Sequence, residues 1–226
     1  MDEVARMIRA VIFDMDGVLT DSEPVINAAA IAGLREYGID PKPEDFHPFV
    51  GMGEDGYIGG VAARYGLTYA PEMKRRVYEI YLDILPGMIR AFPGVRELLQ
   101  SLMARDIRLA VASSADRVKV EANLGAIGVG LAWFGAVVVG EDVERKKPAP
   151  DIFLAAARRL GVPPAACCVV EDAPNGVRAA KAAGMRCVAV EQSFPAADLA
   201  PAGPEVIRAS VSGIRLADLG IAVSGD

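Results

Sequence analysis

The chain has 226 residues, of which 52% are hydrophobic and 24% charged; this is the composition of a folded globular protein and excludes a disordered chain. The formal net charge of −6 argues against nucleic acid or an anionic membrane surface as the main partner. No apolar run approaches the roughly 18 residues that a membrane-spanning helix requires. Because the chain is acidic overall, an anionic small substrate would need local positive charge. We expect the chain to be a monomer.

The three cysteines, Cys167, Cys168 and Cys187, are odd in number and lack the spacing of a metal site. Buried, reduced thiols in a cytosol-like compartment are the expected state. The polar start of the chain has no signal-peptide pattern, so the location expected from these features is cytoplasmic.

The first part of the chain contains one strand pattern and then only helical patterns. The strand is short, apolar and β-branched, which is typical of a buried parallel strand. Thr20 and Asp21 follow it and form either part of a hairpin flap or a plain turn. No strand pattern occurs between Pro24 and Ala91, which indicates an all-helical insert of four or five helices. The predicted elements are the strand 8–13 and helices at 24–37, 57–65 and 71–85.

From residue 92 onwards, strand and helix patterns alternate, which predicts a parallel sheet with right-handed βαβ connections. The fold class is therefore α/β, with a Rossmann-like core (1–23 and 92–226) interrupted by a helical cap (24–91). The predicted strands are 108–113, 136–139, 167–172, 185–191 and a weak one at 206–211; the predicted helices are 95–104, 115–128, 150–160, 174–184 and a short one around Asp218 and Leu219.

Polar residues follow four of the predicted strands. Ligands of open parallel sheets bind beyond the carboxyl ends of the strands, so these residues should meet at one rim. They are Asp14 and Asp16, Ser113 and Ser114, Lys146 and Lys147, and Glu171 and Asp172.

This set suits phosphoryl transfer. Asp14, Asp172 and Glu171 offer oxygen ligands to a hard cation such as Mg²⁺, although Glu171 could instead lie just behind the ligands. The cation and the Lys147 ammonium would neutralise the phosphoryl oxygens. Asp14 could attack phosphorus as a carboxylate, and Asp16 could protonate the leaving oxygen and then activate water.

Three further residues, Ser113, Ser114 and Gly17, belong to the predicted phosphate site. The Ser113 hydroxyl and the backbone N–H groups at the start of the next helix can hold phosphate oxygens. Ser114 could also contact phosphate, or it could cap that helix. Gly17 permits a tight turn because its φ is unrestricted. Lys147 is preferred to Lys146 because the proline after it stiffens the approach.

Four segments resemble, in order, the four motifs of the haloacid dehalogenase superfamily. The closest resemblance is to the β-phosphoglucomutase-like branch, which carries a helical cap after the first motif. The segments are "FDMDG" (13–17), "ASSAD" (112–116), "KKPAPDIF" (146–153) and "VVEDAPNGVRAAKAAGM" (169–185).

The resemblance implies a role for each matching residue. Asp14 would be the nucleophile and Asp16 the general acid and base. Mg²⁺ would be bound by Asp14, the backbone carbonyl of Asp16 and Asp172, with Glu171 beside it. Ser113 and Lys147 would bind phosphate.

Two cap positions depart from the sugar phosphomutases of this branch. Ile26 occupies the place of their cap histidine, and Glu54 stands where their specificity loop carries an arginine. A mutase must hold two phosphates, so hydrolysis of a small-molecule phosphate monoester is favoured over a phosphomutase. A regulatory domain with little turnover is a third alternative. The acidic, glycine-rich loop from Gly51 to Gly56 should determine the leaving group, and Gly51 is expected among the residues that bind substrate or phosphate.

A finer resemblance involves "FVGMGEDGYIGGVA", "AVASSADRVKVEANL" and "KPAPDIFLAAA". These segments look like the hydrolase domain of large plant and algal chloroplast proteins that suppress photoprotective quenching. If the chain is part of such a protein, its location would be the chloroplast. His47 is expected to be structural or exposed, while Met52 and Tyr57 either line the cap pocket or simply pack.

Overall fold

A computed structural model describes residues 7–50 and 52–222. Its centre is a six-stranded sheet in the order β5-β4-β1-β6-β7-β8, in which every neighbouring pair is parallel. Phe13 at the end of β1 pairs with Val111 and Val170, so three strands end at the same level. The predicted α/β core is confirmed. The strands are β1 Ala10–Phe13, β4 Arg108–Ala112, β5 Ala136–Val138, β6 Cys167–Glu171, β7 Arg186–Val190 and β8 Val206–Arg208.

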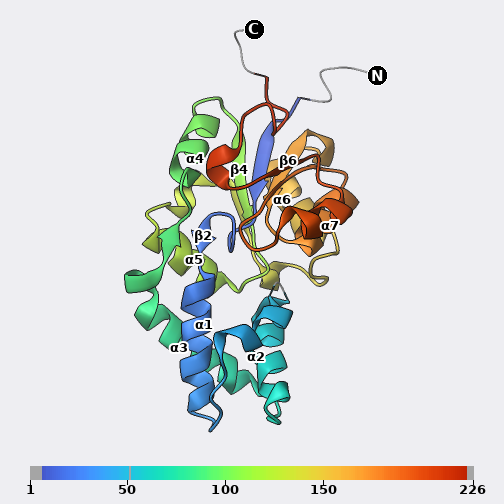
Figure 1. Cartoon of the computed structure of the whole chain (residues 1–226). Helices are drawn as coiled ribbons and strands as arrows, with labels where there is room; N and C mark the ends of the chain where they lie inside the picture. Colours follow the sequence, from blue (N-terminus) through green and yellow to red (C-terminus); the bar gives the residue numbers. More distant parts are fainter. Residues whose placement is uncertain (1–6, 51, 223–226) are drawn as a thin grey trace.

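Helices cover both faces of the sheet (Figure 1). On one face, Phe13 packs with Leu99 and Leu124; on the other, Ile12 packs with Phe153. Side chains alternate across a strand, so Cys168 joins the first cluster and Cys167 the second; both thiols are free and buried, as predicted. The first face is covered by α4 (Val95–Met103) and α5 (Arg117–Ala126), the second by α6 (Asp151–Leu160) and α7 (Pro174–Ala182), and the short α8 spans Ala196–Leu199.

The helices between β2 and β3 form the cap, the lower body in Figure 1. They enclose a hydrophobic cluster of their own that includes Leu34, Phe46, Ile58, Val77 and Tyr81. The boundaries 23/24 and 91/92 of the two domains stay a prediction. In its described residues the cap contains three α-helices and two single-turn 3-10 helices: α1 Glu23–Arg35, α2 Gly53–Arg64, α3 Pro71–Met88, η2 Pro43–Asp45 and η3 His47–Phe49.

The two chain segments that join core and cap run side by side. β2 (Thr20–Asp21) pairs antiparallel with β3 (Arg90–Ala91), so Thr20 and Asp21 form a hairpin-like flap. The expectation of no strand between Pro24 and Ala91 is therefore wrong for the last two residues of this segment, which form β3. Two paired residues are too few to produce a period-2 pattern in the sequence.

The predicted short helix around Asp218 and Leu219 is also wrong, because these residues lie in a turn. The Asp218 carboxylate accepts hydrogen bonds from the backbone N–H of Arg215 (2.8 Å) and from Nε of Arg208 (2.9 Å). A local side-chain bond of this kind satisfies the backbone without a helix. Within the described residues, no helix combines the length and apolar character that crossing a bilayer demands.

Candidate active site

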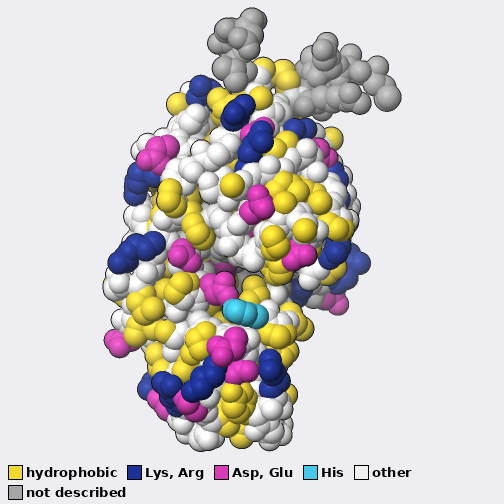
Figure 2. All heavy atoms as spheres, viewed as in Figure 1, with side chains coloured by type: hydrophobic (Ala, Val, Ile, Leu, Met, Phe, Trp, Pro, Cys, Tyr) yellow, Lys and Arg dark blue, Asp and Glu magenta, His cyan; other side chains and the backbone are white. Residues whose placement is uncertain are grey.

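A pocket of about 160 Å³ lies between the carboxyl edge of the sheet and the cap. Figure 2 shows a hollow at this waist of the molecule. The predicted residues that line it are Asp14, Asp16, Gly17, Ser113, Ser114, Lys147, Glu171 and Asp172. The loop residue Gly51 lies outside the described residues, and Lys146 is exposed, with its ammonium on the Gly140 carbonyl instead.

The chain turns tightly directly after β1, in the segment that contains Asp14 and Asp16. The Met15 carbonyl accepts hydrogen bonds from the backbone N–H groups of Leu19 (2.8 Å) and Thr20 (3.0 Å), which folds the chain back at once. Gly17 has a φ of 77°. A Cβ at this position would also overlap Oδ2 of Asp172, so the tight turn and the close approach both require glycine.

Lys147 joins the ends of two strands. Its Nζ lies 2.5 Å from Oδ1 of Asp14 and 2.6 Å from Oε1 of Glu171. The other oxygen of Glu171 accepts the backbone N–H groups of Asp172 and Ala173, both at 2.8 Å. Glu171 is only 1% exposed, and a buried carboxylate needs hydrogen-bond partners, which these three groups provide. Glu171 thus anchors the lysine beside Asp14.

The shared burial shifts the protonation equilibria. Burial raises the pKa of Asp14 to about 7; Lys147 opposes this shift and the charge of Glu171 adds to it. Burial also raises the pKa of Asp172 well above its usual value, and the charges of Glu171 and Asp14 raise it further. Burial alone would lower the pKa of Lys147, but the two carboxylates outweigh it and raise that pKa.

The donor set fits a hard divalent cation. Asp14, Glu171 and Asp172 each offer an oxygen, and these oxygens lie within 4.8 Å of one another. Three buried carboxylates exceed the one ammonium beside them, so a cation there would relieve their repulsion. Ser193, from the loop after β7, also lines the pocket, and its side chain opposes the rise in the pKa of Asp172. This serine had no signal in the sequence, because a single hydroxyl in a loop matches no motif.

Ser113 follows β4 and is 1% exposed. Its Oγ accepts the backbone N–H of Ala115 at 3.1 Å, which leaves the hydroxyl proton free to donate to a ligand. Ser114 lines the pocket beside it. The N-cap position of α5 belongs to Asp116, whose carboxylate pairs with Lys74 of the cap at 2.8 Å instead of capping the helix.

The cap supplies a largely apolar roof. Ile26 lines the pocket, as does Tyr57, whose hydroxyl accepts a hydrogen bond from Asn27 at 3.1 Å. Met52 is 61% exposed and is not among the pocket-lining residues. His47 is exposed in η3, as expected.

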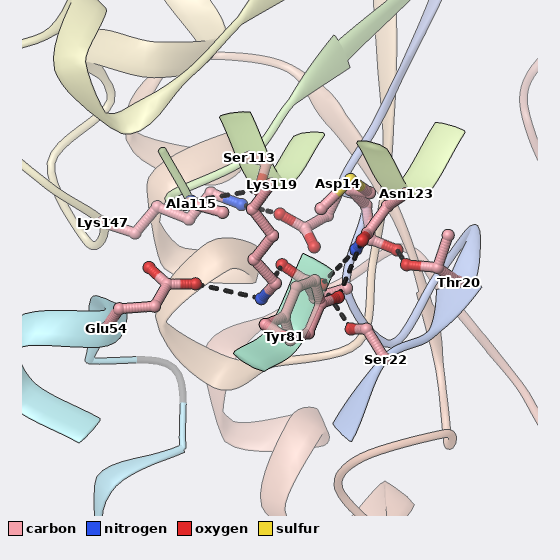
Figure 3. A network of polar contacts seen from close by, with 12 residues as sticks. Asp14, Thr20, Ser22, Glu54, Tyr81, Ser113, Ala115, Lys119, Asn123 and Lys147 are labelled. Carbon is pink, nitrogen blue, oxygen red and sulfur yellow. Dashed lines mark hydrogen bonds and ion pairs between the residues drawn. The ribbon is translucent and has the colours of Figure 1, made fainter. Parts of the chain in front are cut away.

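Sequence reasoning missed a polar network that includes Lys119, Glu54, Asn123 and Tyr81, which Figure 3 shows from close by. The Lys119 ammonium lies 3.1 Å from Oδ2 of Asp16 and 3.0 Å from Oε1 of Glu54. Asn123, one helical turn further along α5, approaches the other oxygen of Asp16 at 3.5 Å. In the sequence "RVKVEANL", these two residues have the pattern of an ordinary solvated helix face.

The chain matches a known protein family over most of its length. The model of the haloacid dehalogenase-like hydrolases matches residues 8–184, which is more than half of the chain and includes every predicted site residue. The chain belongs to this family.

Among the relatives of this hydrolase-family chain is the protein SUPPRESSOR OF QUENCHING 1, chloroplastic, of Arabidopsis thaliana, 46% identical over 94% of the chain. The match spans only 20% of that larger protein. A phosphorylated carbohydrates phosphatase of Thermotoga maritima is 35% identical, over 79% of this chain and 82% of its own length. The crystal structure of CbbY from Rhodobacter sphaeroides in complex with phosphate is similar, with a TM-score of 0.85, 29% identity and coverage of 95% of this chain and 100% of that one.

Proposed function

We propose that this chain is a Mg²⁺-dependent phosphatase that hydrolyses small phosphate monoesters through an aspartyl-phosphate. One observation carries the proposal: Asp14 lies at the end of β1 in a buried pocket, with Lys147 at 2.5 Å and the Asp172 and Glu171 carboxylates beside it. A nucleophilic carboxylate, a fixed cation and metal-ligand oxygens at one place are what phosphoryl transfer needs. The phosphatase name of the Thermotoga relative supports the same chemistry.

The proposed reaction has two steps. In the first, a carboxylate oxygen of Asp14 attacks phosphorus, the bond from phosphorus to the leaving oxygen breaks, and Asp16 gives that oxygen its proton. In the second, Asp16 takes a proton from water as the water oxygen attacks phosphorus, and the bond to Asp14 breaks. Phosphate and the free Asp14 carboxylate result.

Lys147 and Ser113 are placed to hold the phosphoryl group during both steps. The Lys147 ammonium faces the charge that develops on the phosphoryl oxygens, and the Ser113 hydroxyl can donate to one of them. Asp14 and Asp172, with Glu171 beside them, would hold Mg²⁺. When bound, this cation supplies additional positive charge to the same oxygens.

The pocket favours substrates with a single phosphate. Among its described lining residues, the only cations are Lys119 and Lys147, and each is already paired with two carboxylates. A second phosphate on the substrate would therefore meet no free positive charge. A mutant of the Rhodobacter sphaeroides CbbY, by contrast, has been crystallised in complex with Xylulose-(1,5)bisphosphate. We expect a neutral, sugar-like leaving group to suit this chain better.

A screen tests the function directly. The protein with Mg²⁺ is incubated with sugar, nucleotide and glycolytic phosphates, and phosphate release is measured for wild type and for Asp14→Asn. We expect turnover of several monoesters by wild type, inhibition by EDTA, and none above background in the variant. Metal-dependent turnover by Asp14→Asn would refute the mechanism.

The same screen separates the alternatives. Conversion of a hexose 1-phosphate to the 6-phosphate would indicate a phosphomutase, and uniformly flat activity would favour a regulatory domain. Of the two compartments predicted from the sequence, the identity to the Arabidopsis chloroplast protein supports the chloroplast.

A further inference from the structure

Lys119 is a buried cation to which the proposed reaction assigns no role. It lies in the first turn of α5 and is only 4% exposed. Its ammonium contacts Asp16 of the core at 3.1 Å and Glu54 of the cap at 3.0 Å. Glu54 is itself 7% exposed. A buried lysine is costly unless it is paired, so these two carboxylates are what keep it charged in place.

Asp16 is held on both of its carboxylate oxygens. Oδ2 faces Lys119, while Oδ1 accepts hydrogen bonds from the Ser22 hydroxyl and from Nδ2 of Asn123 (3.5 Å). Lys119 and Asn123 are four residues apart, so they lie on one face of α5. That helix face is therefore built around the Asp16 side chain.

The cap completes the network from its own side. The Tyr81 hydroxyl of α3 donates to Oδ1 of Asn123 at 2.7 Å, which leaves the Asn123 amide free to point at Asp16. Glu54 of α2 provides the second carboxylate for Lys119. Figure 3 shows Glu54 and Tyr81 approaching Lys119 and Asn123 at the boundary of cap and core.

We propose that Lys119 is a positioning residue that aligns Asp16 for proton transfer, and that Glu54 makes this alignment depend on a closed cap. The inference rests on the proposed function, since it concerns the group that protonates the leaving oxygen. Without Glu54 the ammonium would face Asp16 alone. Without Tyr81 the Asn123 amide would lose its fixed orientation. A general acid works only within hydrogen-bond reach of the leaving oxygen, so a rotation of Asp16 removes its contribution.

The consequence is specific to the leaving group. In the first step the proton passes from Asp16 to the oxygen whose bond to phosphorus breaks. A nitrophenolate leaves readily without that proton, whereas an unsubstituted phenolate depends on it. Loss of Asp16 alignment should therefore slow phenyl phosphate much more than p-nitrophenyl phosphate, two esters of similar shape.

The test measures kcat/KM for both esters with Mg²⁺, in wild type and in Lys119→Met. This parameter covers only the steps up to formation of the aspartyl-phosphate, so the later use of Asp16 as a base does not obscure it. We expect a loss of about 100-fold for phenyl phosphate and of less than about 5-fold for p-nitrophenyl phosphate. Asp16→Asn should display the same contrast between the two esters.

Lys74→Met is the matched control. Lys74 also joins cap and core, through Asp116 at 2.8 Å, but it is not among the residues that line the pocket. We expect this variant to change kcat/KM for both esters by the same factor, whatever its size. A uniform loss in Lys119→Met would mean that Lys119 only holds the fold together, and would overturn the proposal.

Glu54→Gln provides a second, nearly isosteric variant in case Lys119→Met fails to fold. It should lower kcat/KM for phenyl phosphate by about 10-fold and for p-nitrophenyl phosphate by less than about 3-fold. Equal effects on both esters would refute the coupling to the cap. A wild-type protein inactive on every ester, including the substrate panel, would instead refute the proposed function, and this inference with it.

Discussion

Lys147 and Asp14 are 133 positions apart in the chain, yet the ammonium of one lies 2.5 Å from a carboxylate oxygen of the other. The same ammonium lies 2.6 Å from Glu171. One cation therefore connects the ends of β1 and β6, the two adjacent strands that supply the acidic residues. Because all three side chains are buried, removal of any partner leaves charge that water cannot compensate.

Replacement of Lys147 by methionine should both destabilise the protein and stop turnover. The free energy of unfolding in urea at pH 8 should fall by about 3–5 kcal/mol, because two buried carboxylates lose their partner. Turnover should fall by about 100-fold or more, because the phosphoryl oxygens lose a fixed cation. Lys146→Met is the control; this exposed residue donates a hydrogen bond from its ammonium to the Gly140 carbonyl, so we expect a change below about 1 kcal/mol.

Metal-free protein should be more stable at pH 5 than at pH 8. The pKa of Asp14 is about 7 in the fold, against 3.8 ordinarily, so the folded state binds the proton more tightly than the unfolded state. This contribution to stability is fully present below pH 4 and is lost as the pH rises through 7. The stability lost between pH 5 and pH 8 is therefore about 2–3 kcal/mol, because each pH unit below the folded pKa corresponds to about 1.4 kcal/mol.

Urea unfolding in EDTA at both pH values measures this effect, with Asp14→Asn as the comparison. The variant cannot titrate at this position, so its stability should change less with pH. Mg²⁺ should narrow the wild-type difference, because a cation favours the charged carboxylates. Identical pH dependence in both proteins would contradict the raised pKa of Asp14.

Asp172→Asn should weaken the binding of Mg²⁺. The residue offers one of the three clustered carboxylate oxygens, and an amide in its place carries no charge. We expect the Mg²⁺ concentration for half-maximal activity, and the dissociation constant measured by calorimetry, to rise by about 10- to 100-fold. Unchanged affinity would place the metal elsewhere. Asp142→Asn, whose carboxylate pairs with Arg117 and Arg159 away from the pocket, serves as the control.

Gly176→Ala should disturb the site although residue 176 bears no functional group. A Cβ there would overlap Oε1 of Glu171, the oxygen that holds Lys147. We expect a loss of stability of about 1–3 kcal/mol and reduced turnover. Gly125→Ala in α5 has open space around it and should instead stabilise the protein by about 0.5–1 kcal/mol. Thermal unfolding of both variants measures the contrast.

The strand ends were predictable because each follows a short apolar run. Asp14, Ser113, Lys147 and Asp172 come after four such runs, and parallel strands place their carboxyl ends at one edge. The pairing of Thr20–Asp21 with Arg90–Ala91 was not predictable in full, since two-residue strands leave no periodic signal. The roles of the site residues and the domain boundaries stay predictions.

The sequence by itself determined the fold class, from the order of strand and helix patterns along the chain, and the family, from four ordered motifs. It also indicated which residues follow the strand ends, because hydrophobic periodicity is a local property. Only the tertiary structure revealed the partners of Asp16. In the sequence, Lys119 and Asn123 have the pattern of a solvated helix face, and Glu54 has the pattern of an exposed acidic residue in a loop. Closure of the cap over α5 buries all three side chains together. A buried charge is stable only when a partner compensates it. Burial results from the packing of segments that are distant in the sequence, so no single segment predicts it.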